Sequence, residues 1–296
     1  RRVRSVGELV EVTAFRVGLL RLERMIKERM SLVPPSQPLA PTQLINARPI
    51  IASIHEFFRT SQLSTILDQT NPLSEIDNLR RLTVMGSGGI SRERASFSIR
   101  DINASQYGRI CPVRSPEGPN IGLVTYIALF ARVNEYGFLE TPYRRVIQRK
   151  RGRKIESVAV SEIVYLSADD EETHYITHSE VPMVGNVITA DRVPARFKRE
   201  FLEVDTNFIE FMDVIPRQVV GTAASLIPFI GHDEANRALM GTHMQCQAVP
   251  LVKPDSPIVG TGMEEEVAQV MGRVVRVEDS GTVSYVDAEK VVIRRQ

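Results

Sequence analysis

The sequence YGRICPVRSPEGPNIGL, residues 107–123, is the most informative stretch of the chain. Its second half, PEGPNIGL, places two prolines and two glycines around Glu117 and Asn120. Proline fixes φ and removes a backbone donor, whereas glycine permits positive φ and a close approach of the backbone. The stretch therefore excludes a regular helix or a central strand. It predicts a rigid turn at residues 116–123, the signature turn, which presents the Glu117 carboxylate and the Asn120 amide.

The composition of the 296 residues, 43% apolar and 25% charged, is typical of a globular protein. The 37 Lys and Arg against 36 Asp and Glu leave a net charge of +1. The overall charge therefore gives no indication of nucleic-acid binding, which only a local basic patch could provide. There is no apolar run of about 18 residues and no apolar segment after the N-terminal RRVR, so we expect no membrane span, membrane partner or signal peptide. The missing initiator Met indicates a fragment, and two distant cysteines favour a reduced, cytoplasmic setting.

The pattern of apolar residues predicts an α+β fold of mixed helices and small antiparallel sheets. We expect amphipathic helices at residues 5–31 and 48–58 and a strand-rich segment at residues 97–145. A hairpin at residues 273–294, from Val274 onward, is expected to turn at residues 279–281.

Changes in composition divide the chain into three predicted regions. Residues 1–150 hold the N-terminal helices and the signature turn. A basic tract then opens a small external α+β module at residues 151–220, and residues 221–296 return to core-like sequence with the C-terminal hairpin.

Seven arginines and no lysine lie between Leu79 and Ser115, opposed only by Glu93 and Asp101, a local excess of 7 − 2 = +5: Arg80, Arg81, Arg92, Arg94, Arg100, Arg109 and Arg114. Arginine suits bidentate contacts with phosphate, so the cluster is consistent with a phosphodiester-binding surface. The alternative is that these arginines pair with acidic residues elsewhere. Charge alone leaves both interpretations open.

The other candidate sites are weaker. The glycine loop at residues 86–89 lacks the G-K-[ST] ending of a P-loop and the spacing of a dinucleotide fingerprint. His174 and His178 have no third ligand at motif spacing, so we predict an exposed strand face and no metal site. No D-x-D pattern occurs, so we expect no catalytic metal centre in this chain.

Thirteen ordered blocks resemble the beta subunit of bacterial DNA-directed RNA polymerase: RRVRSVGEL, FRVGLLRLER, INARPI, FF-x-TSQLS, LDQTNPLSEI, GGISRERA, YGRICP, SPEGPNIGL, NEYGFLETPYR, ASLIPFI, HDEANRALMG, MQCQAVPL and VGTGME. The resemblance implies a fragment of a multidomain subunit that contains the fork region and the external 1 module. It implies a nucleotidyltransferase complex with alpha, beta-prime, omega and sigma subunits, a DNA template, an RNA transcript and NTPs. The catalytic Mg²⁺ would be on beta-prime, so this chain alone would bind no cofactor and be inactive.

The resemblance also assigns site residues. Glu117 and Arg237 would lie near the incoming NTP. The nucleic-acid contacts would be Arg1, Arg4, Gln62, Arg81, Arg92, Arg94, Asn120 and Gln247. The wall occupied by rifamycins would include Gln62, Leu63, Thr65, Ile66, Asp68, Asn78, Arg81, Thr83, Met85, Pro116 and Asn120.

Several positions depart from the commoner residues of that family. Thr65, Asn78 and Thr83 stand where Gln, His and Ser are common. Arg114-Ser115 replaces Glu-Thr before the PEGP turn, and His243 and Cys246 replace Asn and Arg. Two alternatives stay open: a non-catalytic nucleic-acid- or inhibitor-binding scaffold derived from the same fold, and an unrelated phosphate-binding enzyme that uses the glycine loop.

Overall fold

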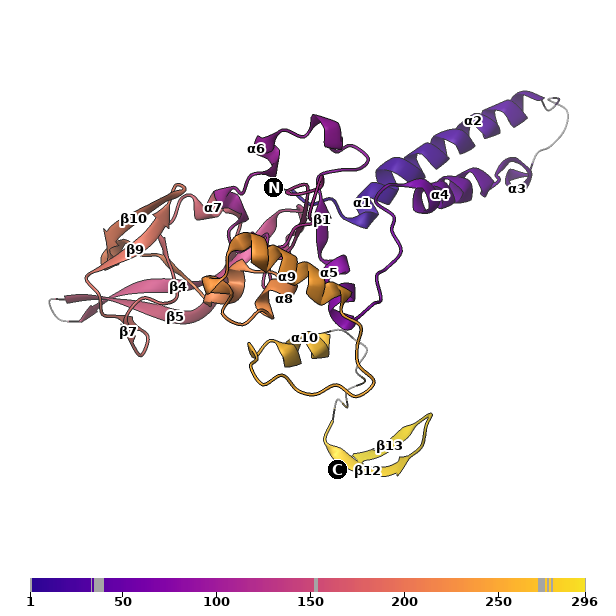
Figure 1. Cartoon of the computed structure of the whole chain (residues 1–296). Coiled ribbons are helices and arrows are strands. Elements are labelled where there is room, and N and C mark those ends of the chain that lie inside the picture. The colour runs from indigo at the N-terminus through magenta and orange to yellow at the C-terminus, as the bar shows by residue number, and fades with distance from the viewer. Residues whose placement is uncertain are drawn as a thin grey trace.

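The computed structural model describes residues 2–32, 34, 40–151, 154–270, 275, 277 and 279–295. It confirms the predicted α+β class, because helices alternate with small, mostly antiparallel sheets (Figure 1). Arg1 and Val274, named in the predictions above, lie outside the described residues. Within the described ranges, no helix is both long enough and apolar enough to cross a membrane.

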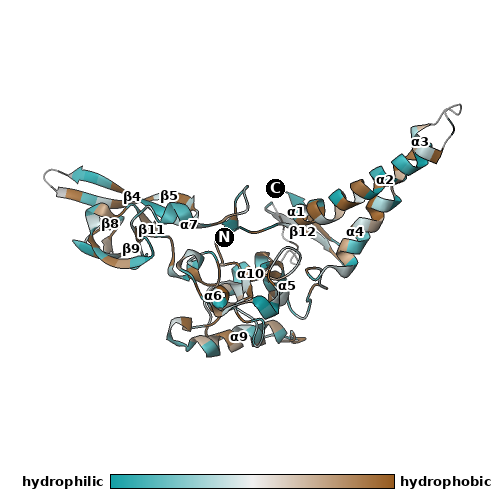
Figure 2. Ribbon diagram, turned by 90° about the horizontal axis from the view of Figure 1, so that it is seen from above, coloured by the Kyte–Doolittle hydropathy of each residue, from teal (hydrophilic) through white to brown (hydrophobic). Residues whose placement is uncertain are grey.

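The N-terminal helices form an arm that projects from the rest of the chain (Figure 1). Helix α1 (Val6–Val10), a π-helical turn (Glu11–Phe15) and α2 (Arg16–Leu32) follow one another directly, and α3 (Pro41–Leu44) leads into α4 (Arg48–Thr60). Both predicted helices are thus confirmed. Gly18 allows α2 to approach α4 closely, since a Cβ built there would lie 3.0 Å from Ile50 Cα. Figure 2 shows hydrophobic residues recurring along both helices.

The segment that carries the signature turn has little regular structure. Its elements are α5 (Pro72–Leu79), β1 (Arg81–Thr83), the 3₁₀ turns Arg92–Arg94 and Ala104–Gln106, α6 (Phe97–Arg100) and β2 (Val124–Tyr126). Strands β1 and β2 pair antiparallel, with Arg81 opposite Tyr126. The predicted strand-rich segment is wrong for residues 97–123, which form short helical turns and loops, because prolines, glycines and capping polar residues there prevent a continuous ladder.

The described part of the chain contains a nine-stranded sheet in the order β10-β9-β6-β11-β4-β5-β8-β7, with β3 paired to β4. Its strands are β3 (Arg132–Val133), β4 (Leu139–Arg151), β5 (Lys154–Leu166), β6 (Ile176–Thr177), β7 (Met183–Val184), β8 (Val187–Ile188), β9 (Arg192–Phe197), β10 (Glu200–Asp205) and β11 (Phe211–Asp213). Helix α7 (Ala168–Glu171) follows β5, and a 3₁₀ turn (Thr206–Phe208) follows β10. Val146, Val193 and Met212 belong to the buried core of this sheet. The predicted boundary at residue 150 falls near the tip of the β4–β5 hairpin, and the division into three regions stays a prediction.

The C-terminal part begins beside the signature segment and ends in a separate hairpin (Figure 1). Its elements are the 3₁₀ turns Pro216–Val219 and Ile230–His232, α8 (Thr222–Ser225), α9 (Ala235–Gln247), α10 (Glu264–Val270), β12 (Gly281–Val286) and β13 (Val291–Arg295). Helix α9 packs against α5 and α8.

The turn of the C-terminal hairpin was predicted at residues 279–281, and this position is wrong. Gly281 is the first residue of β12 and pairs with Arg295. The chain turns after β12 instead, where Asp287 Oδ1 accepts hydrogen bonds from the backbone N–H groups of Glu289 (2.8 Å) and Lys290 (2.7 Å). An aspartate that caps its own turn replaces the glycine turn that was expected.

Candidate nucleic-acid interface

The signature turn is closed by a hydroxyl group. Ser115 Oγ donates to the carbonyl oxygen of Val124 (3.0 Å) and accepts from the backbone N–H of Gly122 (3.0 Å), which joins the two ends of the turn. Gly118 and Gly122 have φ values of +86° and +73°. A side chain is unfavourable at such values, so the two glycines are required by the backbone itself.

Arg100 braces the turn from one side. Its Nη1 donates to the carbonyl oxygens of Pro119 (2.7 Å) and Ile121 (2.9 Å). The turn approaches so closely that a Cβ on Gly122 would lie 2.5 Å from the Arg100 carbonyl oxygen. The braced turn leaves Glu117 exposed at its tip. Asn120 is half-buried, and within the described residues its Oδ1 is buried without a hydrogen-bond partner.

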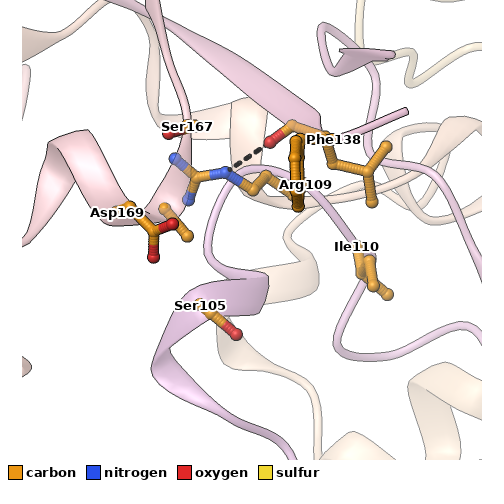
Figure 3. Close-up of a pocket in the computed structure, with 8 residues that line it drawn as sticks. Ser105, Arg109, Ile110, Phe138, Ser167 and Asp169 are labelled. Carbon is orange, nitrogen blue, oxygen red and sulfur yellow. Dashed lines mark hydrogen bonds between the residues drawn. The ribbon is translucent and has the colours of Figure 1, made fainter. Parts of the chain in front are cut away.

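Arg109 is one of four arginines of the cluster whose guanidinium groups bind other parts of the chain. Its guanidinium donates to the carbonyl oxygens of Leu139 (3.1 Å) and Leu166 (2.9 Å) and pairs with Glu171 (2.5 Å). Figure 3 shows this side chain lining a cavity with Ser167, where a dashed line marks one of its hydrogen bonds. The cavity of about 40 Å³ is far smaller than the roughly 300 Å³ at which small-molecule sites begin, so Arg109 is a structural group.

Arg114 is also buried, at the junction of three elements. Its Nε and Nη2 both donate to Asp77 Oδ2 on α5, at 2.9 and 2.7 Å. The guanidinium lies 4.7 Å from the centre of the Tyr126 ring on β2. Nη2 also contacts Cys246 Sγ on α9 at 3.5 Å, and Nη1 lies 3.4 Å from His243 Nδ1. These contacts fix the segment before the signature turn to α5, β2 and α9.

Two further arginines of the cluster, both half-buried, donate to backbone carbonyl groups. Arg80 donates to Ala128 and Leu129, and Arg100 braces the signature turn as described above. Burial lowers the pKa of Arg80 from its ordinary value, although the nearby Asp77 opposes this shift. Burial therefore favours a structural role for Arg109 and Arg114, whereas Arg80 and Arg100 are half-buried and use part of their donors on backbone carbonyl groups.

Arg81, Arg92 and Arg94 remain on the surface, and in the described part of the chain none of the three makes an ion pair. Arg81 is at the start of β1, which leads into the glycine loop, and the other two follow that loop. Arg4 lies beside the same loop, since a Cβ on Gly88 would lie 3.0 Å from Arg4 Nη1. We refer to these four residues as the exposed arginines. Among the described residues, Arg81, Arg92 and Arg94 have no ion-pair partner, and Arg4 has a long contact of 3.9 Å with Glu8.

The residues assigned to a rifamycin-like wall divide into two groups. Gln62, Thr65, Ile66 and Asp68 lie on an exposed segment after α4, and Leu63 packs against the glycine loop at Gly86. Arg81, Thr83, Met85, Asn78, Pro116 and Asn120 lie on or beside β1, α5 and the signature turn. Within the described residues, no hydrogen bond joins Thr65, Asn78 and Thr83 to one another.

Asp68 is held as a carboxylate. The hydroxyl (2.7 Å) and backbone N–H (3.1 Å) of Thr70 both donate to its Oδ1 and lower its pKa from the ordinary value. This exposed segment therefore carries a negative charge shortly before α5.

The last predicted site residues lie on α9. Arg237 is exposed near the start of this helix, and Gln247 is exposed at its last residue, where its Nε2 lies 2.9 Å from His243 Nε2. Asn71 ties the C-terminal end of α9 to the beginning of α5, because its Nδ2 donates to the carbonyl oxygens of Gln245 (2.9 Å) and Ala248 (2.8 Å).

Sequence reasoning did not identify the residues that support the turn. Asp77 and Tyr126 lie outside the quoted motifs, and Asp77 depends on Arg114, which is 37 residues away. Ser115 opens the block SPEGPNIGL, but nothing in that block indicated that its hydroxyl joins the two ends of the turn. The two prolines and two glycines that follow Ser115 indicated only that a turn was present. For Asp77 the one available signal was an acidic residue in α5, after Glu75 and shortly before Arg80 and Arg81.

The histidines considered for a metal make other contacts. His174 Nδ1 lies 2.6 Å from Glu210 Oε2, and His178 Nδ1 accepts a hydrogen bond from the backbone N–H of Glu180. The described residues contain no group of three or more His, Cys, Asp or Glu side chains arranged to hold a metal ion.

The two cysteines provide a test of the packing around Arg114. Cys111 and Cys246 are buried free thiols, and burial raises the pKa of Cys246 to about 12. At pH 8 only about one part in 10⁴ of Cys246 would then be thiolate, against about a quarter for an exposed thiol of pKa about 8.5. We expect both thiols of the folded protein to resist an aromatic disulfide reagent at pH 8 and to react in denaturant. Rapid labelling of Cys246 without denaturant would contradict this packing.

Two family models match the chain in succession. The model described as "RNA polymerase Rpb2, domain 3" matches residues 65–133, and "RNA polymerase beta subunit external 1 domain" matches residues 143–214. The first match includes the exposed arginines 81, 92 and 94 and the signature turn. The second coincides with most of the nine-stranded sheet. Both define a class, the large subunits of multisubunit RNA polymerases.

Curated relatives extend the match over the whole chain. The DNA-directed RNA polymerase subunits beta of Clostridium botulinum (strain Loch Maree / Type A3) and Syntrophomonas wolfei are each 50% identical over 296 residues. These matches cover 100% of this chain and 23% and 26% of the relatives, respectively. The corresponding subunit of Acetivibrio thermocellus is 50% identical over 99% of this chain and 23% of its own length. The chain belongs to the family of bacterial RNA polymerase beta subunits, and it spans about a quarter of the length of these relatives.

Proposed function

We propose that the chain acts within an assembled DNA-directed RNA polymerase, where it helps to hold the RNA–DNA hybrid, the downstream DNA and the incoming NTP. The observation that carries this proposal is the division of the arginine cluster. Four arginines bind other groups of the chain, and two of these, Arg109 and Arg114, are buried, whereas Arg81, Arg92 and Arg94 stay exposed around the glycine loop without an ion pair in the described part of the chain. Such arginines suit phosphate contacts that position nucleic acid.

The contribution to catalysis would be electrostatic and positional. Glu117 and Arg237 are exposed on the braced turn and on α9, and both would lie near the incoming NTP, where the Arg237 guanidinium would help to hold the triphosphate for in-line attack. The catalytic Mg²⁺ would be held by the beta-prime subunit. Alpha, omega and sigma subunits, the DNA template and the transcript complete the proposed set of partners, in the cytoplasm.

Removing two exposed arginines should weaken the hold on nucleic acid in a salt-dependent way. In a reconstituted polymerase, log K for nucleic acid falls as log salt rises. Arg81→Ala with Arg92→Ala should make this negative slope shallower by about two, because each phosphate contact contributes about one. The measurement is the stability of the elongation complex between low and moderate salt.

The matched control is Arg145→Ala with Arg192→Ala. These two surface arginines lie on β4 and β9. Their ion pairs are long, 3.8 Å with Glu162 and 3.6 Å with Asp205, and Arg192 also donates to the carbonyl oxygen of Glu203 at 3.1 Å. We expect their removal to leave the slope unchanged. An unchanged slope in the Arg81 and Arg92 variant, with the complex still assembled, would show that these arginines do not contact phosphate.

The chain by itself should not synthesise RNA. No grouped metal-binding carboxylates occur among the described residues, so extension of a primed template is expected to be undetectable with either Mg²⁺ or Mn²⁺. Template-dependent extension by the purified chain would refute the proposal. Tight binding of single-stranded nucleic acid by the isolated chain, without polymerase subunits, would favour a free-standing scaffold instead.

A further inference from the structure

A buried polar cluster joins the elements that carry the proposed contact residues. Asp77 lies on α5, which leads directly into Arg81 on β1. Arg114 lies three residues before Glu117, and Cys246 lies on α9, the helix that carries Arg237 and Gln247. The side chains of Arg114 and Asp77 are only 6% and 4% exposed. The cluster is thus the place where the signature turn, α5 and α9 meet.

Arg114 is the centre of this cluster. Two of its N–H groups converge on one oxygen of Asp77, while Nη2 also reaches Cys246 Sγ and Nη1 lies near His243 Nδ1. The Tyr126 ring covers one face of the guanidinium. A lysine could keep the charge but not the planar fork that reaches α5 and α9 at once.

Arg109 offers a direct comparison. It is an equally buried arginine in the same segment, but its bonds go to Glu171 and to the carbonyl oxygens of Leu139 and Leu166, at the base of the β4–β5 hairpin. Arg109 therefore fixes the segment to the sheet. Arg114 fixes it to the two helices beside the proposed nucleotide contacts.

We propose that Arg114 is a positioning residue for the nucleotide site. Through Asp77 and Cys246 it fixes the signature turn relative to α9, and so fixes the position of Glu117 relative to Arg237. This inference rests on the proposed function, because it assumes that those two residues face the incoming NTP. A small displacement between two such groups misplaces the reacting atoms of a bound NTP and weakens its productive binding.

The test is steady-state nucleotide addition by a reconstituted polymerase with a defined primer and template. Arg114→Met is expected to raise KM for the NTP by roughly tenfold, with a smaller change in kcat, and Arg114→Lys should restore part of the loss. Arg109→Lys, the matched control, should reduce the yield of assembled enzyme without changing KM.

Arg114→Met leaves Asp77 as an unpaired buried charge, which can prevent folding. The combination Asp77→Asn with Arg114→Met removes that charge, so this enzyme should assemble while keeping the raised KM. A normal KM in the assembled double variant would overturn the proposal. An equal rise in Arg109→Lys would also overturn it, by showing a general loss of packing.

Failure of the proposed function would give a different experimental result. Glu117→Gln and Arg237→Ala alter the exposed groups themselves and leave the buried cluster intact. If both enzymes keep a normal KM for the NTP, the proposed nucleotide contacts are rejected, whatever the Arg114 variants show. If both raise KM but the Arg114 variants do not, only the positioning role is rejected.

Discussion

A polymerase that contains this chain is expected to transcribe in the presence of submicromolar rifampicin. The resemblance places residues 60–86 in the wall that rifamycins occupy, and three polar positions there differ from the commoner choice. Thr65 is shorter than Gln and has no amide donor, and Asn78 lacks the ring area of His. Thr83 adds a methyl group to the hydroxyl of Ser, which crowds a close-fitting ligand.

The structure describes the hydroxyl of Thr83. Its Oγ1 accepts a hydrogen bond from the backbone N–H of Met85 at 3.1 Å, which a Ser hydroxyl can do equally well, so the difference from Ser is the added methyl group. A ligand group that loses its partner on burial costs about 1–3 kcal/mol. Two such losses together with crowding reduce affinity by several powers of ten, since about 1.4 kcal/mol corresponds to a factor of ten.

The measurement is promoter-dependent transcription by the reconstituted enzyme over a range of drug concentrations. The triple change Thr65→Gln, Asn78→His and Thr83→Ser should make the enzyme sensitive. Thr173→Gln, at an exposed site after α7, is the control and should change nothing. The prediction is wrong if the parent enzyme is strongly inhibited, or if the triple variant is no more sensitive than the parent.

The Arg109→Met variant is expected to lose about 3–5 kcal/mol of unfolding free energy, the usual cost of breaking a buried ion pair. The side chains of Arg109 and Glu171 are only 3% and 14% exposed, and Arg109 also donates to the carbonyl oxygens of Leu139 and Leu166. Its removal leaves the two carbonyl groups without this donor, and it leaves the nearly buried Glu171 carboxylate with Arg196, whose Nη2 lies 3.6 Å from Oε1. Urea unfolding followed by circular dichroism measures the loss.

The control for this variant is a surface ion pair between β4 and β5 of the nine-stranded sheet. Arg145 and Glu162 are each 55% exposed and lie 3.8 Å apart. Arg145→Ala should therefore cost no more than about 1 kcal/mol, because water and salt screen exposed pairs. Equal losses in the Arg109 and Arg145 variants would show that burial does not strengthen the Arg109 pair.

The elements that were predicted correctly are those with strong local patterns. The helices at residues 5–31 and 48–58 repeat apolar residues at three- and four-residue spacing, and they form α1, α2 and α4 with almost the expected bounds. The segment at residues 97–123 has no such repeat, and its turns depend on side-chain caps such as Asn103, which accepts from the backbone N–H of Ser105. The C-terminal hairpin was misplaced because glycine was preferred over an aspartate-capped turn.

The sequence by itself determined the family and the shape of the signature turn. Proline and glycine act through their own φ preferences, so PEGPNIGL specifies a turn wherever its partners lie. Only the tertiary structure decided which arginines are surface groups, because all seven look alike in sequence. Arg114 finds Asp77 at a separation of 37 residues and Cys246 at 132. Burial and pairing depend on such distant partners, and they leave Arg81, Arg92 and Arg94 facing solvent.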